Sequence, residues 1–147
     1  MASLVVHYRD GQNIRWGILV GTAPTSADTT IDVRPIQSPA ATTADVIVAH
    51  ELRDLKTENS PTVTIPATSL LSPITNDAAL ICQGLNYADH AAEAQHHVRK
   101  QNLWFAKANS AISGAYDPIV RPREVQLLDY EVELASCCAS QSTGRSQ

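Results

Sequence analysis

The amino-acid sequence predicts a β-rich α+β fold, with a small N-terminal β domain at residues 1–69 and the first part of a second domain at residues 70–135. Two observations predict this fold. Short stretches of alternating apolar residues, separated by turn residues, fill the first part. A new all-apolar run begins near residue 79, before a helix-favouring stretch. A chain of 147 residues, 44% of them hydrophobic, can bury one small domain plus part of another.

A hairpin is the first expected element. Apolar residues alternate on either side of Asp10 and Gly11, which supply turn chemistry: Leu4, Val6 and Tyr8 before them, and Ile14, Trp16, Ile18 and Val20 after them. The next segment is rich in Ala, Thr, Ser, Asp and Pro and contains one short strand candidate at residues 30–33. Two weaker apolar stretches, at residues 46–49 and 62–65, complete the expected β-rich domain.

The second domain is expected to begin at a change of composition after residue 69. Residues 79–82 are all apolar, as in a strand that is covered on both faces. Residues 87–98 lack Gly and Pro and favour a helix of about three turns. Residues 103–105 and 126–135 are the next strand candidates, the second of them with alternating apolar positions.

Charge and cysteine content exclude several classes of protein. The net charge of -4 leaves no excess of basic residues for phosphates, so neither nucleic acid nor an anionic membrane is an expected partner. No apolar run approaches the roughly 20 residues of a membrane span, and the start lacks a signal-peptide pattern. Cys82, Cys137 and Cys138 lack the spacing of a disulfide framework or zinc site. We therefore expect a cytoplasmic protein, with a mitochondrial location left open.

His90 and Glu93 form the first candidate catalytic pair. They are three residues apart in the expected helix and so lie on one face. A carboxylate beside an imidazole fixes its tautomer and favours its protonated form, so the pair can take a proton from water and return it. An ordinary helix surface would show the same spacing. A remote alternative is a histidine-based metal carrier that uses His90, His96 and His97, although His96 and His97 fit a solvated surface better.

Acidic residues follow one face of the last expected strand: Asp129, Glu131 and Glu133. Same-face neighbours on a strand lie about 7 Å apart, so two carboxylates can converge on one hard divalent cation. A strand with one solvent-facing polar side would give the same alternation. Pattern alone leaves both interpretations open.

Four linked motifs resemble the fumarylacetoacetate hydrolase family in content, order and spacing. The family pattern is roughly G-x-N-Y-x-x-H-x-x-E, F-x-K, G-x-x-D-P-I and D-Y-E-x-E-L-A. The corresponding segments here are GLNYADHAAE at 84–93, FAK at 105–107, GAYDPI at 114–119 and DYEVELA at 129–135. The resemblance spans about residues 70–135, while residues 1–65 are similar only loosely to the variable N-terminal domain of some members.

The resemblance implies a role for each matching position. His90 and Glu93 would be the acid/base dyad that activates water, and Glu131 and Glu133 two of three carboxylate ligands of Mg²⁺ or Mn²⁺, with Ca²⁺ as another option. Lys107 would approach substrate oxygens. The implied fold is a mixed β-sandwich roll. The implied activity is metal-dependent hydrolysis of a carbon-carbon bond in a 2-oxo or 1,3-dicarbonyl acid, or decarboxylation of an oxaloacetate-like acid on the same scaffold.

The family pattern breaks after Ala135. The third metal-binding Asp and the second substrate lysine of the family are absent, and residues 136–147 form a polar, low-complexity tail expected to be unstructured. We therefore expect a C-terminally truncated family protein, and the enzyme assignment stays uncertain. The alternative is a non-catalytic fragment that forms a homodimer or pairs with a full-length homologue, since the family commonly dimerises.

Overall fold

The computed structural model describes residues 4–37, 40–51, 60–87, 89 and 102–138. The chain forms two compact units, a first unit of Met1–Thr75 with Ser113–Gln147 and a second unit of Asn76–Ile112. The domain boundaries expected from the sequence, at residues 69 and 135, remain predictions. The description below takes each unit by itself.

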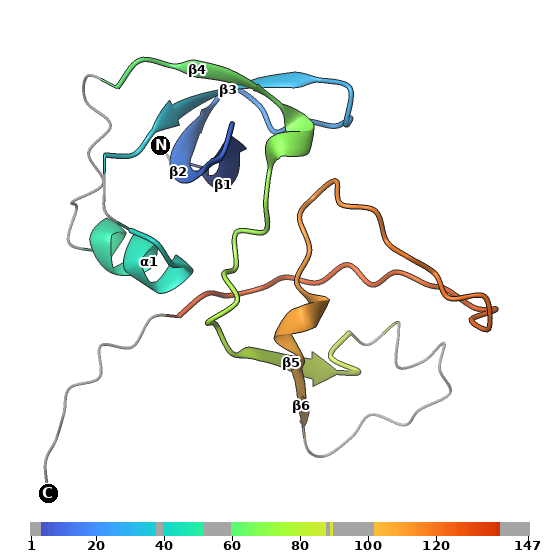
Figure 1. The fold of residues 1–147 in the computed structure, drawn as a ribbon. Helices are drawn as coiled ribbons and strands as arrows, with labels where there is room; N and C mark the ends of the chain where they lie inside the picture. Colours follow the sequence, from blue (N-terminus) through green and yellow to red (C-terminus); the bar gives the residue numbers. More distant parts are fainter. Residues whose placement is uncertain (1–3, 38–39, 52–59, 88, 90–101, 139–147) are drawn as a thin grey trace, which may run out of the picture. The chain divides into compact units, whose positions relative to one another are not determined.

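The first unit contains a four-stranded antiparallel sheet (Figure 1). Its strands are neighbours in the order in which they occur along the chain: β1 (Val5–Asp10), β2 (Asn13–Val20), β3 (Thr30–Pro35) and β4 (Val63–Pro66). The expected hairpin and the strands expected near residues 30–33 and 62–65 are confirmed. Gly11, at φ 60°, occupies the tight turn between β1 and β2, where a positive φ favours glycine.

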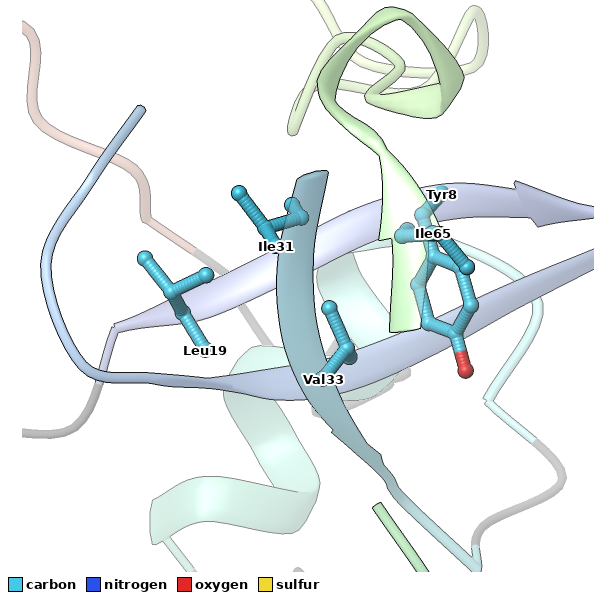
Figure 2. Close-up of a cluster of buried hydrophobic side chains, with 5 residues drawn as sticks. All are labelled: Tyr8, Leu19, Ile31, Val33 and Ile65. Atoms are coloured by element: carbon cyan, nitrogen blue, oxygen red, sulfur yellow. The ribbon is translucent and has the colours of Figure 1, made fainter. Parts of the chain in front are cut away.

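The sheet curls so that its chain returns to the first strand. A short 3-10 turn, η1 (Ala67–Ser69), follows β4, and Leu70 then forms a bridge with Tyr8 of β1. Five buried side chains fill the interior, as Figure 2 shows: Tyr8, Leu19, Ile31, Val33 and Ile65. Val6, Val63 and Leu70 pack against this cluster from its edge. Burial of such side chains contributes about 1.5–3 kcal/mol each and is the main source of stability here.

The alternation of apolar residues in β2 identifies the strand but does not mark its core face. Val6 pairs with Gly17 and His7 pairs with Trp16, so Gly17 and Leu19 lie on the side of the core. Trp16 lies on the opposite side, where its ring stacks on His7 with centroids 4.3 Å apart. Both faces of this hairpin therefore bury aromatic rings.

The weak apolar stretch at residues 46–49 forms a helix, α1 (Thr43–Glu51), so its assignment to a β-rich segment was wrong. The helix is fixed by a capping box. The Asp45 N–H donates to Thr42 Oγ1 at 3.1 Å, and the Thr42 N–H donates to Asp45 Oδ2 at 3.0 Å. Reciprocal bonds of this kind satisfy backbone groups that the first helical turn leaves open. Val46 is buried on this helix.

The second unit contains the antiparallel pair β5 (Leu80–Gly84) and β6 (Leu103–Lys107), followed by the 3-10 turn η2 (Asn109–Ala111). Both expected strands are confirmed, but the expectation that the first is covered on both faces was wrong. Ile81 is 61% exposed and Trp104, on the same face, is 58% exposed. Each strand has one partner among the described residues, so their apolar runs reflect strand propensity more than burial.

The described part of the chain is thus β-rich with few helices, as the sequence predicts. All its strand pairings are antiparallel. The more specific expectation of a mixed β-sandwich roll stays a prediction. None of the described helices has the length and apolar character to cross a membrane.

Candidate active site

Lys107 ends strand β6 and is the predicted substrate-binding residue that the structure places on a regular element. It pairs with Leu80 at the start of β5 and is exposed. Its ammonium nitrogen lies 5.8 Å from the centroid of the Phe105 ring, two residues earlier on the same face. That distance is at the outer range of a cation–π contact and leaves the ammonium group open to solvent.

A turn follows the end of β5. Gly84 ends the strand, and Leu85 has a φ of 55°, in the left-handed region that residues other than glycine rarely adopt. An added Cβ on Gly84 would lie 3.0 Å from Leu103 Cδ2, so the neighbouring strand passes close by. The backbone is helical at Asp89. The strand therefore ends in a turn at Leu85, before the acid/base motif.

The predicted dyad, His90 and Glu93, lies outside the described residues, as do His96 and His97 of the alternative metal-carrier reading. Most of the helix expected at residues 87–98 lies outside them too. These assignments stay predictions. The positive φ of Leu85 is a feature that sequence reasoning missed, because leucine carries no signal for this conformation.

The G-x-x-D-P motif forms a closed turn in the first unit. The Gly114 N–H donates to Asp117 Oδ2 at 2.6 Å, and the Asp117 N–H donates to the Gly114 carbonyl at 3.3 Å. An added Cβ on Gly114 would lie 2.9 Å from the Leu70 carbonyl oxygen, so glycine allows the turn to approach that carbonyl closely. The Tyr116 hydroxyl donates to the Pro24 carbonyl at 3.3 Å. Asp117 thus shapes the turn.

Residues 126–135 are not a strand in the structure, which contradicts the sequence expectation. The segment is irregular and exposed: Leu128 is 61%, Tyr130 84% and Val132 83% exposed. Alternation favours a strand only where a neighbouring strand accepts its backbone hydrogen bonds, and none of the described strands pairs with this segment. The predicted metal ligands Glu131 and Glu133 are therefore exposed on irregular backbone.

The donor types fit a hard divalent cation, but the described residues do not form a complete site. Carboxylate oxygens such as those of Glu131 and Glu133 are the ligands that Mg²⁺, Mn²⁺ and Ca²⁺ prefer. Among the described residues, no group of three or more His, Cys, Asp or Glu side chains could hold a metal ion. Lys107 belongs to the second unit and the two glutamates to the first.

Comparison with known proteins places a family segment over these motifs. The family model described as fumarylacetoacetate (FAA) hydrolase C-terminal matches residues 79–146. The match includes the four motifs and continues past Ala135 into the expected tail. No solved structure matches the chain significantly.

Curated relatives match a similar length of chain. A protein of Xenopus laevis named as a mitochondrial oxaloacetate tautomerase is 49% identical over 67 residues, which are 46% of this chain and 21% of the relative. Its counterpart in Bos taurus is 46% identical, with the same coverage. A fumarylacetoacetate hydrolase domain-containing protein 2 homolog of Dictyostelium discoideum is 36% identical over 89 residues, 60% of this chain and 29% of the relative. The matched region thus spans less than a third of each relative.

Proposed function

This chain belongs to the fumarylacetoacetate hydrolase family through residues 79–146, and from that premise we propose that it serves the keto–enol interconversion of oxaloacetate. The observation that carries the proposal is the identity of 46% and 49% with relatives named as oxaloacetate tautomerases, over a region as long as the family segment. Oxaloacetate is also a 2-oxo acid, the substrate class that the motifs imply. The activity of the whole relatives is proposed here for a chain that matches about a fifth of their length.

In this proposal Glu131 and Glu133 hold a divalent cation, Mg²⁺ or Mn²⁺ first and Ca²⁺ as a third option. Their carboxylate oxygens suit such ions, although affinity also depends on the number and rigidity of the ligands. When bound, the cation would neutralise the negative charge that develops on the 2-oxo acid during enolisation. Further ligands would have to come from groups other than the described residues, which contain no complete cluster.

The chain's own residues would move and position the proton. His90, oriented by Glu93, takes a proton from C3 of the keto form and returns a proton to the carbonyl oxygen, so that one C–H bond is replaced by one O–H bond. Lys107 supplies a positive charge to a substrate carboxylate. Its exposure at the end of β6 supports this role, because an ammonium group held in a buried ion pair would not be accessible to substrate.

Hydrolysis of a carbon-carbon bond, the activity first expected from the motifs, is the second candidate. The description of the matching family model names a hydrolase, which favours it. Hydrolysis and decarboxylation both pass through an enolate of the same kind of acid, but each also breaks a carbon-carbon bond. Tautomerisation requires only the proton transfer. The three reactions therefore differ in whether a carbon-carbon bond breaks and in what leaves the site.

Assays with purified chain and Mg²⁺ or Mn²⁺ can separate these reactions. Loss of the ultraviolet absorbance of enol-oxaloacetate reports tautomerisation, carbon dioxide release reports decarboxylation, and carboxylate release from an acylpyruvate reports hydrolysis. We expect tautomerisation that chelation of the metal abolishes. His90→Asn should lower the rate at least about 100-fold, as loss of a general acid/base does. Glu131→Gln should raise the metal concentration required for half-maximal activity. Glu124→Gln, outside the motifs, should change neither the rate nor the metal requirement.

The remaining alternative is a chain that acts only with a partner. Addition of a full-length homologue to the assay tests it, since a mixed pair would supply further groups to the site. Turnover that appears only in the mixture would assign the chain a partner role. No turnover in any arm would contradict the proposal. Because the relatives carry the word mitochondrial in their names, we propose a mitochondrial location, which fractionation of cells would test.

A further inference from the structure

The second unit, Asn76–Ile112, has an entry segment before it, residues 70–75, and an exit segment after it, residues 113–117. We propose that the N-terminal sheet and helix α1 anchor the entry segment, with His7 and Thr43 as positioning residues, and that the exit segment packs against the entry segment. This role is separate from the proposed reaction. The contacts that support it lie within the first unit.

His7 holds the beginning of the entry segment at two points. Its carbonyl accepts the Leu71 N–H at 2.9 Å, and its ring Nδ1 lies 2.8 Å from the Ser72 carbonyl oxygen. Because a carbonyl only accepts, Nδ1 must carry the hydrogen and donate it. The ring is 9% exposed and stacks on Trp16, which fixes the direction in which Nδ1 points. The side-chain bond thus adds to the backbone bond that any residue at position 7 could make.

Thr43, the first residue of α1, holds the end of the same segment. Its Oγ1 donates to the Pro73 carbonyl at 2.8 Å and accepts the Thr75 N–H at 2.8 Å. Its own N–H donates to Thr75 Oγ1 at 2.9 Å. These reciprocal bonds join residues 30 and 32 positions apart in sequence, and they end at Thr75, the last residue before the second unit.

The exit segment contacts the entry segment and the connection between β2 and β3. Gly114 approaches the Leu70 carbonyl so closely that an added Cβ would lie 2.9 Å from its oxygen, and Tyr116 donates to the Pro24 carbonyl. Leu70 itself bridges to Tyr8 of β1. The exit segment therefore lies next to the entry segment within the first unit. Holding two distant segments together reduces the conformational entropy of the chain between them.

Hydrogen exchange of the full chain tests the anchor without any activity measurement. His7→Phe keeps an aromatic ring for Trp16 but removes the donor, whereas His7→Asn keeps an N–H donor near the position of Nδ1 but removes the stacking. A hydrogen bond of about 1 kcal/mol corresponds to roughly fivefold in exchange rate. We expect His7→Phe to speed amide exchange at Leu71, Ser72, Ile74 and Thr75 by about this factor. In His7→Asn the exchange rates of the same amides should stay near those of the native chain.

A second pair of variants keeps the test decisive if substitution of His7 unfolds the sheet. Thr43→Val removes the hydroxyl at nearly constant shape and should speed exchange of the Thr75 amide. Thr43→Ser keeps the hydroxyl and should retain slow exchange of this amide. Amides of β2 and β3 serve as the internal reference and should keep their protection. Equal exchange in Thr43→Val and Thr43→Ser, or loosening of the entry segment only together with the whole sheet, would overturn the proposal.

Discussion

Gly17 of β2 lies beside the Val33 side chain of the neighbouring strand β3, which leaves no room for a side chain at position 17. A Cβ on residue 17 would lie 2.3 Å from Val33 Cγ1 and 3.1 Å from Tyr8 Cε1. Val33 and Tyr8 are the two largest fully buried side chains of the described chain. The absence of a Cβ at position 17 thus allows the valine and the tyrosine ring to share the centre of the core.

Gly17→Ala should therefore destabilise the first unit. The methyl group would have to displace Val33 or the strand backbone, since Arg34 O also lies 3.0 Å away, and overpacking of this kind costs about 1–3 kcal/mol. Urea unfolding followed by Trp16 fluorescence measures the change. Gly84→Ala is the matched control, because its added methyl meets mainly the flexible Leu103 side chain. An unchanged midpoint for Gly17→Ala would contradict this account of the core.

The Tyr8 hydroxyl is buried without a hydrogen-bond partner among the described residues. Leaving such a group unsatisfied costs part of its hydration energy, so Tyr8→Phe should be neutral or should stabilise the chain by up to about 1 kcal/mol. Tyr8→Leu, which also removes the ring, should destabilise it. Thermal unfolding of the three proteins at neutral pH measures both effects. A clear loss of stability in Tyr8→Phe would show that the hydroxyl has a partner.

Tyr8 should also make the fold sensitive to alkaline pH. Burial, and secondarily the charge of Asp10, raise the pKa of Tyr8 above its usual 10.0, because both disfavour the tyrosinate. Because the folded-state pKa is raised, the stability that depends on a protonated Tyr8 hydroxyl is complete below pH 10.0 and is lost as pH rises through the folded pKa. Unfolding curves of Tyr8→Phe should lack this alkaline loss.

Asp45 should give α1 an acid-sensitive start. Hydrogen bonds from the side chain and N–H of Thr42, and then from the N–H of Ala41, lower the pKa of Asp45 below its usual 3.8. Because the folded-state pKa is lowered, the stabilisation of α1 by the ionised Asp45 carboxylate is present above pH 3.8 and is lost as pH falls through the folded pKa. Asp45→Asn should remove this dependence. Helix content by circular dichroism against pH measures it, with the exposed Asp77→Asn as control.

Lys107 should matter for activity and hardly for stability. Its contact with Phe105 is exposed and long, so Lys107→Met should change the free energy of unfolding by less than about 0.5 kcal/mol. If the ammonium group binds a substrate carboxylate, the same variant should raise KM at least about tenfold. Lys107→Arg, which keeps the charge, should recover part of the loss. A stable Lys107→Met protein with native KM would remove the lysine from the proposed site.

The local sequence predicted the strands of the first sheet because their signals do not depend on distant residues. Asp10 and Gly11 mark the first turn, and the alternation around them marks both strands of the hairpin. Residues 46–49 were assigned wrongly because a short apolar run does not distinguish strand from helix. The capping box of Thr42 and Asp45 was the sequence signal that would have indicated the helix.

The site was predictable as a set of motifs and not as a geometry. The order of the four motifs led to the family, which the match of residues 79–146 confirms. The strand expected around Glu131 and Glu133 is absent from the described chain, because a strand requires a neighbour to complete its hydrogen bonds and alternation supplies none. The backbone geometry around the two glutamates thus depends on contacts beyond their own segment.

By itself, the sequence indicated the family of this protein and the positions of the strands that the structure confirms, and it supplied the residues for which chemistry is proposed. Only the tertiary structure decided that the Val33 side chain occupies the space next to Gly17. It also decided that Trp16 stacks on His7 on the face opposite the core, and that Leu70 bridges to Tyr8 of the first strand. The physical reason is that strand propensity and motif spacing are local properties. Which face is buried, and which distant segments share it, follows from register and packing between residues far apart in sequence.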